Sequence, residues 1–199
     1  MKKLLMIAAL MVASLSVNAQ EVGMFFKPMA GATLTTMTGD VDNLKMKMGF
    51  VGGAELGYQF HNMFALTAGA LYTMQGARVS NSENKYMVNT NYLNVPVLLN
   101  IYPIRGLGIK AGAQFGFLMK AKQGGEDIKD YLKKSDFSIP VGLSYEFDDA
   151  VIELRYIIGL SNIKNENFTE NIFYDGNKID SKVHNSSIML TFGYRIPLY

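Results

Sequence analysis

The sequence predicts an all-β fold, an eight-stranded antiparallel up-and-down transmembrane β-barrel with short periplasmic turns and long extracellular loops. Two observations carry this prediction. Apolar and polar residues alternate over segments longer than ordinary strands, and the connections between these segments alternate between tight and long. Helical periodicity is weak throughout, so the period of two decides the fold class.

The N-terminal segment has the order of residues that is typical of a secretory signal. Lys2 and Lys3 precede an apolar run, Leu4–Val12, and Ala19 ends a plausible cleavage site. The run is too short to span a bilayer as a helix. We therefore expect residues 1–19 to be a cleaved signal peptide of the Sec type.

Charge and cysteine content exclude several classes of protein. The chain has 19 Lys+Arg and 17 Asp+Glu, so losing Lys2 and Lys3 leaves 17 of each. A neutral mature chain argues against a nucleic-acid binder. The chain has no cysteine, which excludes disulfides, thiol chemistry and a lipid anchor on Cys. Residues 20–199 have a suitable length for one barrel domain.

Eight segments of alternating pattern follow the signal. In chain order, the expected strands cover about Met24–Met37, Met48–Phe60, Met63–Arg78, Asn91–Tyr102, Leu107–Lys120, Asp136–Phe147, Val151–Ile163 and Ser187–Tyr199. Several have 11 residues or more, against about 5–6 in a typical soluble strand and about 9–11 in a membrane-spanning strand. Their length favours strands that cross a membrane.

The connections alternate in length. Tight turns are expected at 61–62, 103–106 and 148–149, and long connections at 38–47, 76–90, 122–135 and 162–186. Outer-membrane barrels have short periplasmic turns and long extracellular loops. A soluble sandwich has no reason to place every long loop at one end, and a lipocalin-like barrel would have a mostly apolar pocket.

The two faces of each strand differ in a way that places the apolar face outside. Leu56 and Tyr58 alternate with Glu55, and Lys110 and Lys120 lie on the polar face of a later strand. The polar faces combine glycines with charges of both signs, which a soluble core cannot accept. A narrow barrel interior explains both features, because eight strands leave just enough room for side chains.

Four prolines lie within or near the expected strands. Proline cannot donate a hydrogen bond to a β-ladder, so we expect bulges or strand ends at these positions. They are Pro28, Pro96, Pro140 and Pro197.

The inward-facing polar residues form the main candidate site, a lumen polar network. Its expected members are Lys27, Glu55, Gln59, Lys110, Gln114, Asp136, Glu146, Glu153, Arg155 and Arg195, with Asn94 and Asn100. Charges in a narrow interior must pair, which favours a filled, structural plug. The alternative is an ion path or proton relay.

A second candidate is a contact surface in the last long connection. Exposed aromatic residues are enriched at protein interfaces, although a solvated loop is the simpler interpretation. The residues concerned are Phe168, Ile172, Phe173 and Tyr174.

Enzyme signatures are lacking, so we expect no catalytic residues, no cofactor and no metal site. GLSYE lacks the second glycine of a nucleophile elbow, and GFVGGAELG has the wrong spacing for a dinucleotide site. DVDN at Asp40–Asn43 lacks the remaining ligands of a calcium loop.

Three stretches carry a family resemblance. YLNVPVLLNIY (Tyr92–Tyr102), LYTMQGAR (Leu71–Arg78) and SDFSIPVGLSYEF (Ser135–Phe147) resemble strands of the PorT-like outer-membrane β-barrel family of Bacteroidetes. Asn94 and Asn100 stand where members often carry Glu and Lys. The final Tyr199 is similar to the terminal signal that the outer-membrane assembly machinery recognises.

The resemblance implies a protein of the outer membrane of a Gram-negative bacterium. We expect a closed polar lumen and a structural or interaction role through the extracellular loops. A component of a secretion or gliding apparatus, a narrow pore and a soluble ligand-binding barrel are the alternatives. The expected partners are outer-membrane lipid, the assembly machinery during biogenesis and a protein that binds the loops, but no nucleic acid.

Overall fold

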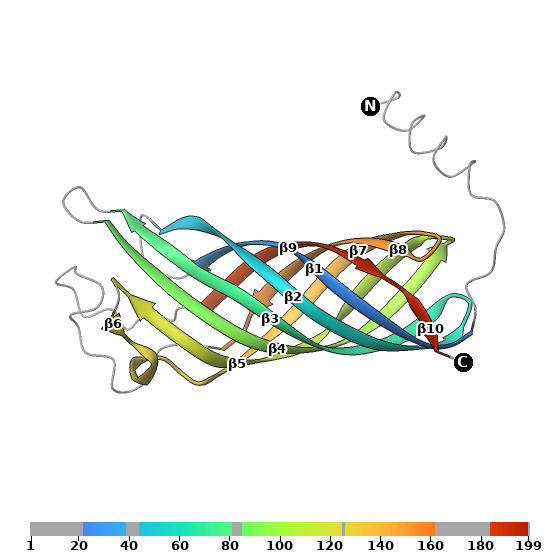
Figure 1. Cartoon of the computed structure of the whole chain (residues 1–199), viewed down its shortest axis with the longest axis horizontal. Helices are drawn as coiled ribbons and strands as arrows, with labels where there is room; N and C mark the ends of the chain where they lie inside the picture. Colours follow the sequence, from blue (N-terminus) through green and yellow to red (C-terminus); the bar gives the residue numbers. More distant parts are fainter. Residues whose placement is uncertain (1–21, 39–43, 81–84, 125, 162–183, 199) are drawn as a thin grey trace, which may run out of the picture.

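The chain folds into a closed antiparallel β-barrel, described here by a computed structural model for residues 22–38, 44–80, 85–124, 126–161 and 184–198 (Figure 1). The wall consists of β1 (Gly23–Thr38), β2 (Leu44–His61), β3 (Phe64–Ser80), β4 (Lys85–Ile104), β5 (Leu107–Gln123), β7 (Ser135–Phe147), β8 (Ala150–Gly159), β9 (His184–Tyr194) and β10 (Ile196–Leu198).

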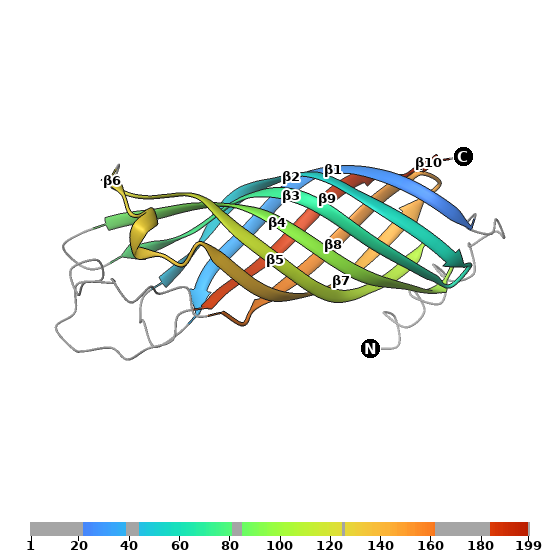
Figure 2. The ribbon, with the colours of Figure 1, turned by 90° about the horizontal axis from the view of Figure 1, so that it is seen from below.

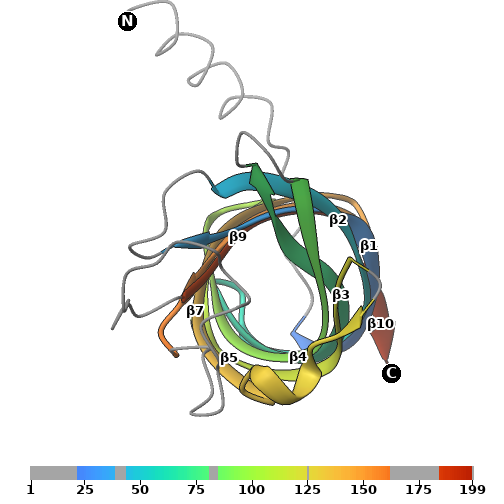
Figure 3. The same cartoon turned by 90° about the vertical axis from the view of Figure 1, so that its left-hand side faces the viewer.

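Closure comes from β1, which pairs with β2 on one side and with β9 and β10 on the other. The partners Met29↔Gly193 and Phe26↔Ile196 belong to one register, so β10 continues β9. The two segments therefore count as one strand, and the barrel has the eight strands that the sequence predicts. Figure 3 shows the closed ring along the barrel axis.

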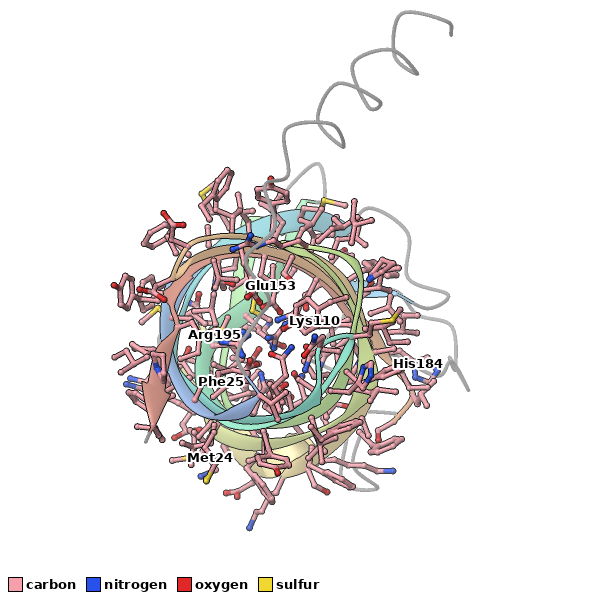
Figure 4. The ribbon with its side chains drawn as sticks, turned by 90° about the vertical axis from the view of Figure 1, so that its right-hand side faces the viewer. Met24, Phe25, Lys110, Glu153, His184 and Arg195 are labelled. Carbon is pink, nitrogen blue, oxygen red and sulfur yellow. The ribbon has the colours of Figure 1, made fainter. Side chains whose placement is uncertain are left out.

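Alternation places apolar side chains outside and polar side chains inside. In β8, Ile152, Leu154 and Tyr156 are exposed, whereas Glu153 and Arg155 are buried. This arrangement inverts that of a soluble protein and confirms the predicted assignment of the two faces. In Figure 4 charged side chains fill the ring and apolar ones surround it.

The two ends of the barrel differ. Three tight connections, at 62–63, 105–106 and 148–149, lie at the end where β1 begins and β10 finishes, which we call the turn end (Figure 1). The opposite end is the loop end. There the connection from β5 to β7, which was expected to be a loop, contains β6 (Glu126–Asp127) and a one-turn 3₁₀ helix, η1 (Lys129–Tyr131).

No helix among the described residues is both long enough and apolar enough to cross a membrane.

The first two long connections were predicted too long, since five of the ten residues at 38–47 and eleven of the fifteen at 76–90 are strand. β2 begins at Leu44, and β3 and β4 pair from Gln75↔Thr90 out to Ser80↔Lys85. The ladder pairs backbone groups, which polar and apolar residues share, so polar residues at the tips hid this extension from the alternation. Strands β2 to β5 have 17 to 20 residues, against 13 in β7 and 10 in β8, and one half of the wall projects further at the loop end (Figure 2).

The prolines produce neither the bulges nor the strand ends that were expected at Pro28, Pro96 and Pro140. Each keeps its register with both neighbouring strands, and the ladder is interrupted on one side only. Pro96, for example, pairs with Gln114 of β5 but has no bridge partner in β3. A proline lacks one backbone donor, so the loss stays on one ladder. Pro197 pairs with Phe25 in the short β10.

Lys120 lies on the outer face of β5 and not on the polar inner face, where the sequence placed it. Tyr92 pairs with Leu118 and Asn91 pairs with Lys120, so Met119 is an extra residue in the strand. This β-bulge shifts the alternation after the buried Leu118, so that Met119 and Lys120 are both exposed and Ala121 is buried.

Candidate functional site

Five charged residues form a cluster in the barrel lumen, which we call the charge cluster. Its members come from four strands, and each is at least 98 % buried: Lys27 on β1, Glu55 on β2, Lys110 on β5, and Glu153 and Arg155 on β8. In Figure 4, Lys110 and Glu153 point into the ring from different parts of the wall.

Glu153 is the hub of the charge cluster. Its Oε2 lies 2.7 Å from Lys110 Nζ and 3.0 Å from Lys27 Nζ, and its Oε1 accepts from Arg155 Nε. Glu55 provides a second acceptor, with Oε2 2.8 Å from Lys27 Nζ and Oε1 bonded to Arg155 Nη2. Lys27 and Arg155 therefore each bridge both carboxylates, and the five side chains behave as one unit.

A second polar group lies nearer the turn end. Arg195 Nη1 is 3.3 Å from Glu146 Oε2, and Arg195 Nη2 donates to Gln59 Oε1. The Tyr102 hydroxyl donates to Glu146 Oε1 at 3.0 Å, and the Arg195 guanidinium lies 3.9 Å from the centre of the Phe25 ring. This group fills the lumen where the barrel approaches its turns.

Three of the predicted amides, unlike Gln59, donate to hydroxyl groups on adjacent strands. Asn94 Nδ2 donates to Thr73 Oγ1 at 2.8 Å, and Asn100 Nδ2 donates to Thr67 Oγ1 at 3.2 Å. Gln114 Nε2 donates to Ser138 Oγ at 3.2 Å. These hydroxyl partners were not predicted as site residues, although their positions on inward faces would have indicated them.

Asp136 stands apart from the other predicted carboxylates. It is half-buried near the start of β7, at the loop end, and its Oδ2 accepts from Asn185 Nδ2 at 3.1 Å. The predicted network is therefore several separate groups along the axis and not one continuous set.

An apolar layer, with side chains from five strands, lies next to the charge cluster on the side of the loop end. Met29 lies one inward position beyond Lys27, and Ile157 one inward position beyond Arg155. The layer consists of Met29, Val51, Leu71, Ile157 and Met189. Sequence reasoning missed it, because inward apolar residues break the expected polar face. A lumen filled in this way excludes water from its middle.

Glycines provide the space into which the large lumen side chains fold. A Cβ atom on Gly69 would lie 2.6 Å from Glu55 Cγ, and one on Gly142 would lie 3.0 Å from Arg155 Cγ. A Cβ atom on Gly57 would overlap the Phe25 ring. The glycines on the polar face thus fit around particular neighbours.

The remaining predicted features form no common site in the described part of the chain. His61 lies beside a tight turn and His184 at the loop end, so the two histidines are at opposite ends of the barrel. Among the described residues, no group of three or more His, Cys, Asp or Glu side chains is placed to hold a metal. Asp40–Asn43 and the predicted contact residues Phe168, Ile172, Phe173 and Tyr174 lie outside the described residues.

Comparison with known proteins agrees with the fold. The family model described as outer membrane protein beta-barrel domain matches residues 15–165. No curated protein matches the sequence.

Several solved structures share the barrel at low sequence identity. Ail, the attachment invasion locus protein of Yersinia pestis, is 19% identical with a TM-score of 0.52, covering 87% of this chain and 99% of its own. Neisserial surface protein A is 15% identical with a TM-score of 0.55, covering 88% and 99%. OprG from Pseudomonas aeruginosa is 13% identical with a TM-score of 0.54, covering 92% and 100%. At such identities the similarity shows the fold alone.

Proposed function

Because this chain belongs to the family of outer membrane proteins with a β-barrel domain, we propose that it is a closed barrel that acts at its loop end. The barrel itself anchors the chain in the outer membrane and has no catalytic or transport role. The segments at the loop end make the contacts with a partner outside the cell.

The filled lumen is the observation that carries this proposal. The charge cluster and the apolar layer lie in series along the axis, and their side chains are buried. Ions need a continuous hydrated path, and a hydrophobic constriction resists wetting. The narrow pore is therefore the weaker alternative, and its support is limited to the polar character of the inward faces.

The apolar exterior supports membrane insertion. Outward side chains such as Met48, Phe115 and Phe192 are about half exposed or more. A soluble protein seldom exposes continuous apolar surface of this extent. We assign the turn end to the periplasm and the loop end to the exterior, with residues 1–19 as a cleaved signal peptide.

The finer classification rests on the resemblance to PorT-like proteins of Bacteroidetes. It supports a second candidate function, a component of a secretion or gliding apparatus. The two candidates differ in one respect: a component of an apparatus has a stoichiometric partner, whereas a free-standing envelope protein does not.

Conductance in a planar bilayer tests the closed lumen. The full chain, refolded and shown by its heat-dependent gel mobility to be a folded barrel, is expected to leave the bilayer at its baseline conductance. Discrete channel openings at the same protein density would contradict the proposal and favour the pore.

Crosslinking in intact cells tests the role of the loop end. A photo-crosslinking residue within 162–183 is expected to capture a partner, whereas the same residue in the tight turn at 148–149 serves as the control for the opposite end. Capture of a single stoichiometric protein would favour the apparatus. Capture from the turn end alone would contradict a loop-end role.

A further inference from the structure

The β-bulge in β5 changes the direction of one lysine. From Lys110 to Leu118 the even-numbered residues face the lumen, so unbroken alternation would bring Lys120 inside as well. The extra residue Met119 ends that alternation, and Ala121 takes the buried position. A bulge disrupts the ladder locally and is commonly a means of re-aiming a side chain. Here it moves a cation from the lumen to the outer wall.

Lys120 lies at the upper border of the apolar exterior. On the outer face of β5, Phe117 and Met119 are 49% and 52% exposed, and Lys120 follows them directly towards the loop end. Its partner on β4 is Asn91, whose Nδ2 donates to the Tyr72 hydroxyl at 2.6 Å. Lys120, Asn91 and the Tyr72 hydroxyl therefore bring polar groups to the outer surface on three neighbouring strands.

The backbone brings two further lysines to this border. Leu118 N donates to Lys134 O at 2.8 Å, which holds the segment before β7 against β5 near the bulge. Lys133 and Lys134 are both exposed. We call Lys120, Lys133 and Lys134 the lysine rim. Figure 2 shows β5 and the β6–η1 segment together at the loop end.

The charge near the lysine rim is predominantly positive. Lys122 near the end of β5 and Lys129 in η1 are half-buried, and the described acidic side chains nearby are Asp127, Asp130 and Asp136. The Asp127 carboxylate accepts from Lys129 N at 2.9 Å, so this acid already has a backbone partner. The rim thus combines a surplus of cations with apolar residues immediately below it.

We propose that the lysine rim binds the phosphate groups of an anionic lipid in the outer leaflet. The inference rests on the proposed function, which places the loop end at that leaflet. Lysine stems lie along apolar surface while their ammonium groups reach phosphates at the level of the headgroups. The apolar residues Phe117 and Met119 contact the acyl chains, which a soluble anion lacks, and so they favour a lipid.

Binding of a defined lipid by the purified full chain tests this inference. The probe is diphosphoryl lipid A titrated into protein in neutral detergent, with bound lipid measured by native mass spectrometry. The variant Lys120→Gln/Lys133→Gln/Lys134→Gln is expected to bind about 10- to 100-fold more weakly, since each basic residue near an anionic surface contributes appreciably. Raising the salt concentration is expected to weaken binding to the wild type more than to the variant.

The matched control is Arg105→Gln, which removes a cation from the tight turn at the other end of the same β4–β5 hairpin. It is expected to bind lipid A as the wild type does. Equal weakening by both variants, or none by the triple variant, would overturn the inference. Tight binding of inorganic phosphate or a soluble polyanion at the rim would also overturn it, because the source would then not be a lipid.

Failure of this inference is distinguishable from failure of the proposed function. Heat-dependent gel mobility shows whether the triple variant is a folded barrel, and conductance reports on the lumen. A closed barrel that binds lipid A independently of the lysine rim would contradict only the inference. A conducting barrel that binds lipid A through the rim would contradict only the closed lumen.

Discussion

Arg155 makes the contacts on which the charge cluster depends. It bonds to both Glu55 and Glu153, and it folds over Gly142 on the neighbouring strand. Its removal would leave two buried carboxylates with only Lys27 and Lys110 as partners. The stability of the middle of the barrel therefore depends on this guanidinium more than on any exposed charge.

Replacing Arg155 with Met keeps much of the side-chain volume and removes the charge. We expect the free energy of unfolding to fall by about 3–5 kcal/mol, the usual cost of breaking a buried ion pair. Urea unfolding in lipid vesicles measures it. The control, Lys120→Gln on the outer wall, is expected to change stability by less than about 0.5 kcal/mol. Equal stability of the Arg155 variant and the wild type would show that the cluster contributes little.

The space over Gly57 supports a second prediction. Ala at position 57 would place its Cβ within the Phe25 ring, so Gly57→Ala is expected to cost about 1–3 kcal/mol by overpacking. In the background of Phe25→Ala the same change should cost clearly less. The same unfolding measurement on the four proteins of this double-mutant cycle checks the coupling, and additive costs would argue against it.

Alternation alone predicted which side chains face inward, but not which of them meet. Glu153 and Arg155 are two residues apart on one strand, so their shared face could be predicted from the sequence. The contact of Lys27 with Glu153 could not, because it depends on the stagger between strands when the barrel closes. The apolar layer was missed for another reason: Met29 and Val51 break the polar pattern, and only the closed structure shows that they meet.

At the scale of elements, the turn between β7 and β8 carries a backbone constraint. Asp148 has φ of +52°, in the left-handed region that residues other than glycine, asparagine and aspartate rarely adopt. Such turns match the twist of antiparallel strands. The tight turn that the sequence predicts at 148–149 therefore also requires a specific backbone conformation at Asp148.

We expect Asp148→Val to destabilise the barrel by about 1 kcal/mol or more, because a β-branched residue is strained at positive φ. Asp148→Gly is expected to be neutral or slightly stabilising. Comparing the two variants by urea unfolding separates the backbone effect from the loss of the carboxylate. Equal destabilisation by both would mean that the carboxylate, and not the backbone, matters.

Strand existence was more predictable than strand length or local irregularity. The eight segments were found because outward Leu, Ile, Phe and Tyr residues mark every strand inside the membrane. Residues 79–80 and 85–90 carry no such alternation in the sequence, although their backbones pair. The bulge at Met119 could not be predicted from the sequence either. The extra residue is recognised only from the pairing of β5 with β4.

At the scale of the whole molecule, two obstacles lie in series along the lumen. The buried charge cluster lies at one level, and the apolar layer lies at the next level towards the loop end. An ion would have to pass both. The narrower of the two levels limits the conductance of such a path. Substitutions at one level alone are therefore not expected to make the barrel conduct ions.

This arrangement predicts a non-additive result. Met29→Ser/Met189→Ser and Lys110→Ser are each expected to remain at the baseline conductance in a planar bilayer, whereas the combined triple variant is expected to show openings. Each protein must first show the gel mobility of a folded barrel. Openings in either of the first two variants, comparable with the triple variant, would mean that the other level is no barrier.

The pairing of Lys27 with Glu153 also has a consequence for how the molecule forms. These residues are 126 positions apart in the chain, and they meet only after β1 has joined β9. Contacts of such high sequence separation form late, since the loop-closure entropy must be overcome first. Before that moment Lys27 can pair only with Glu55 on the adjacent strand β2. We therefore expect the joining of β1 to β9 to exchange hydration of these side chains for ion pairing as the interior dries.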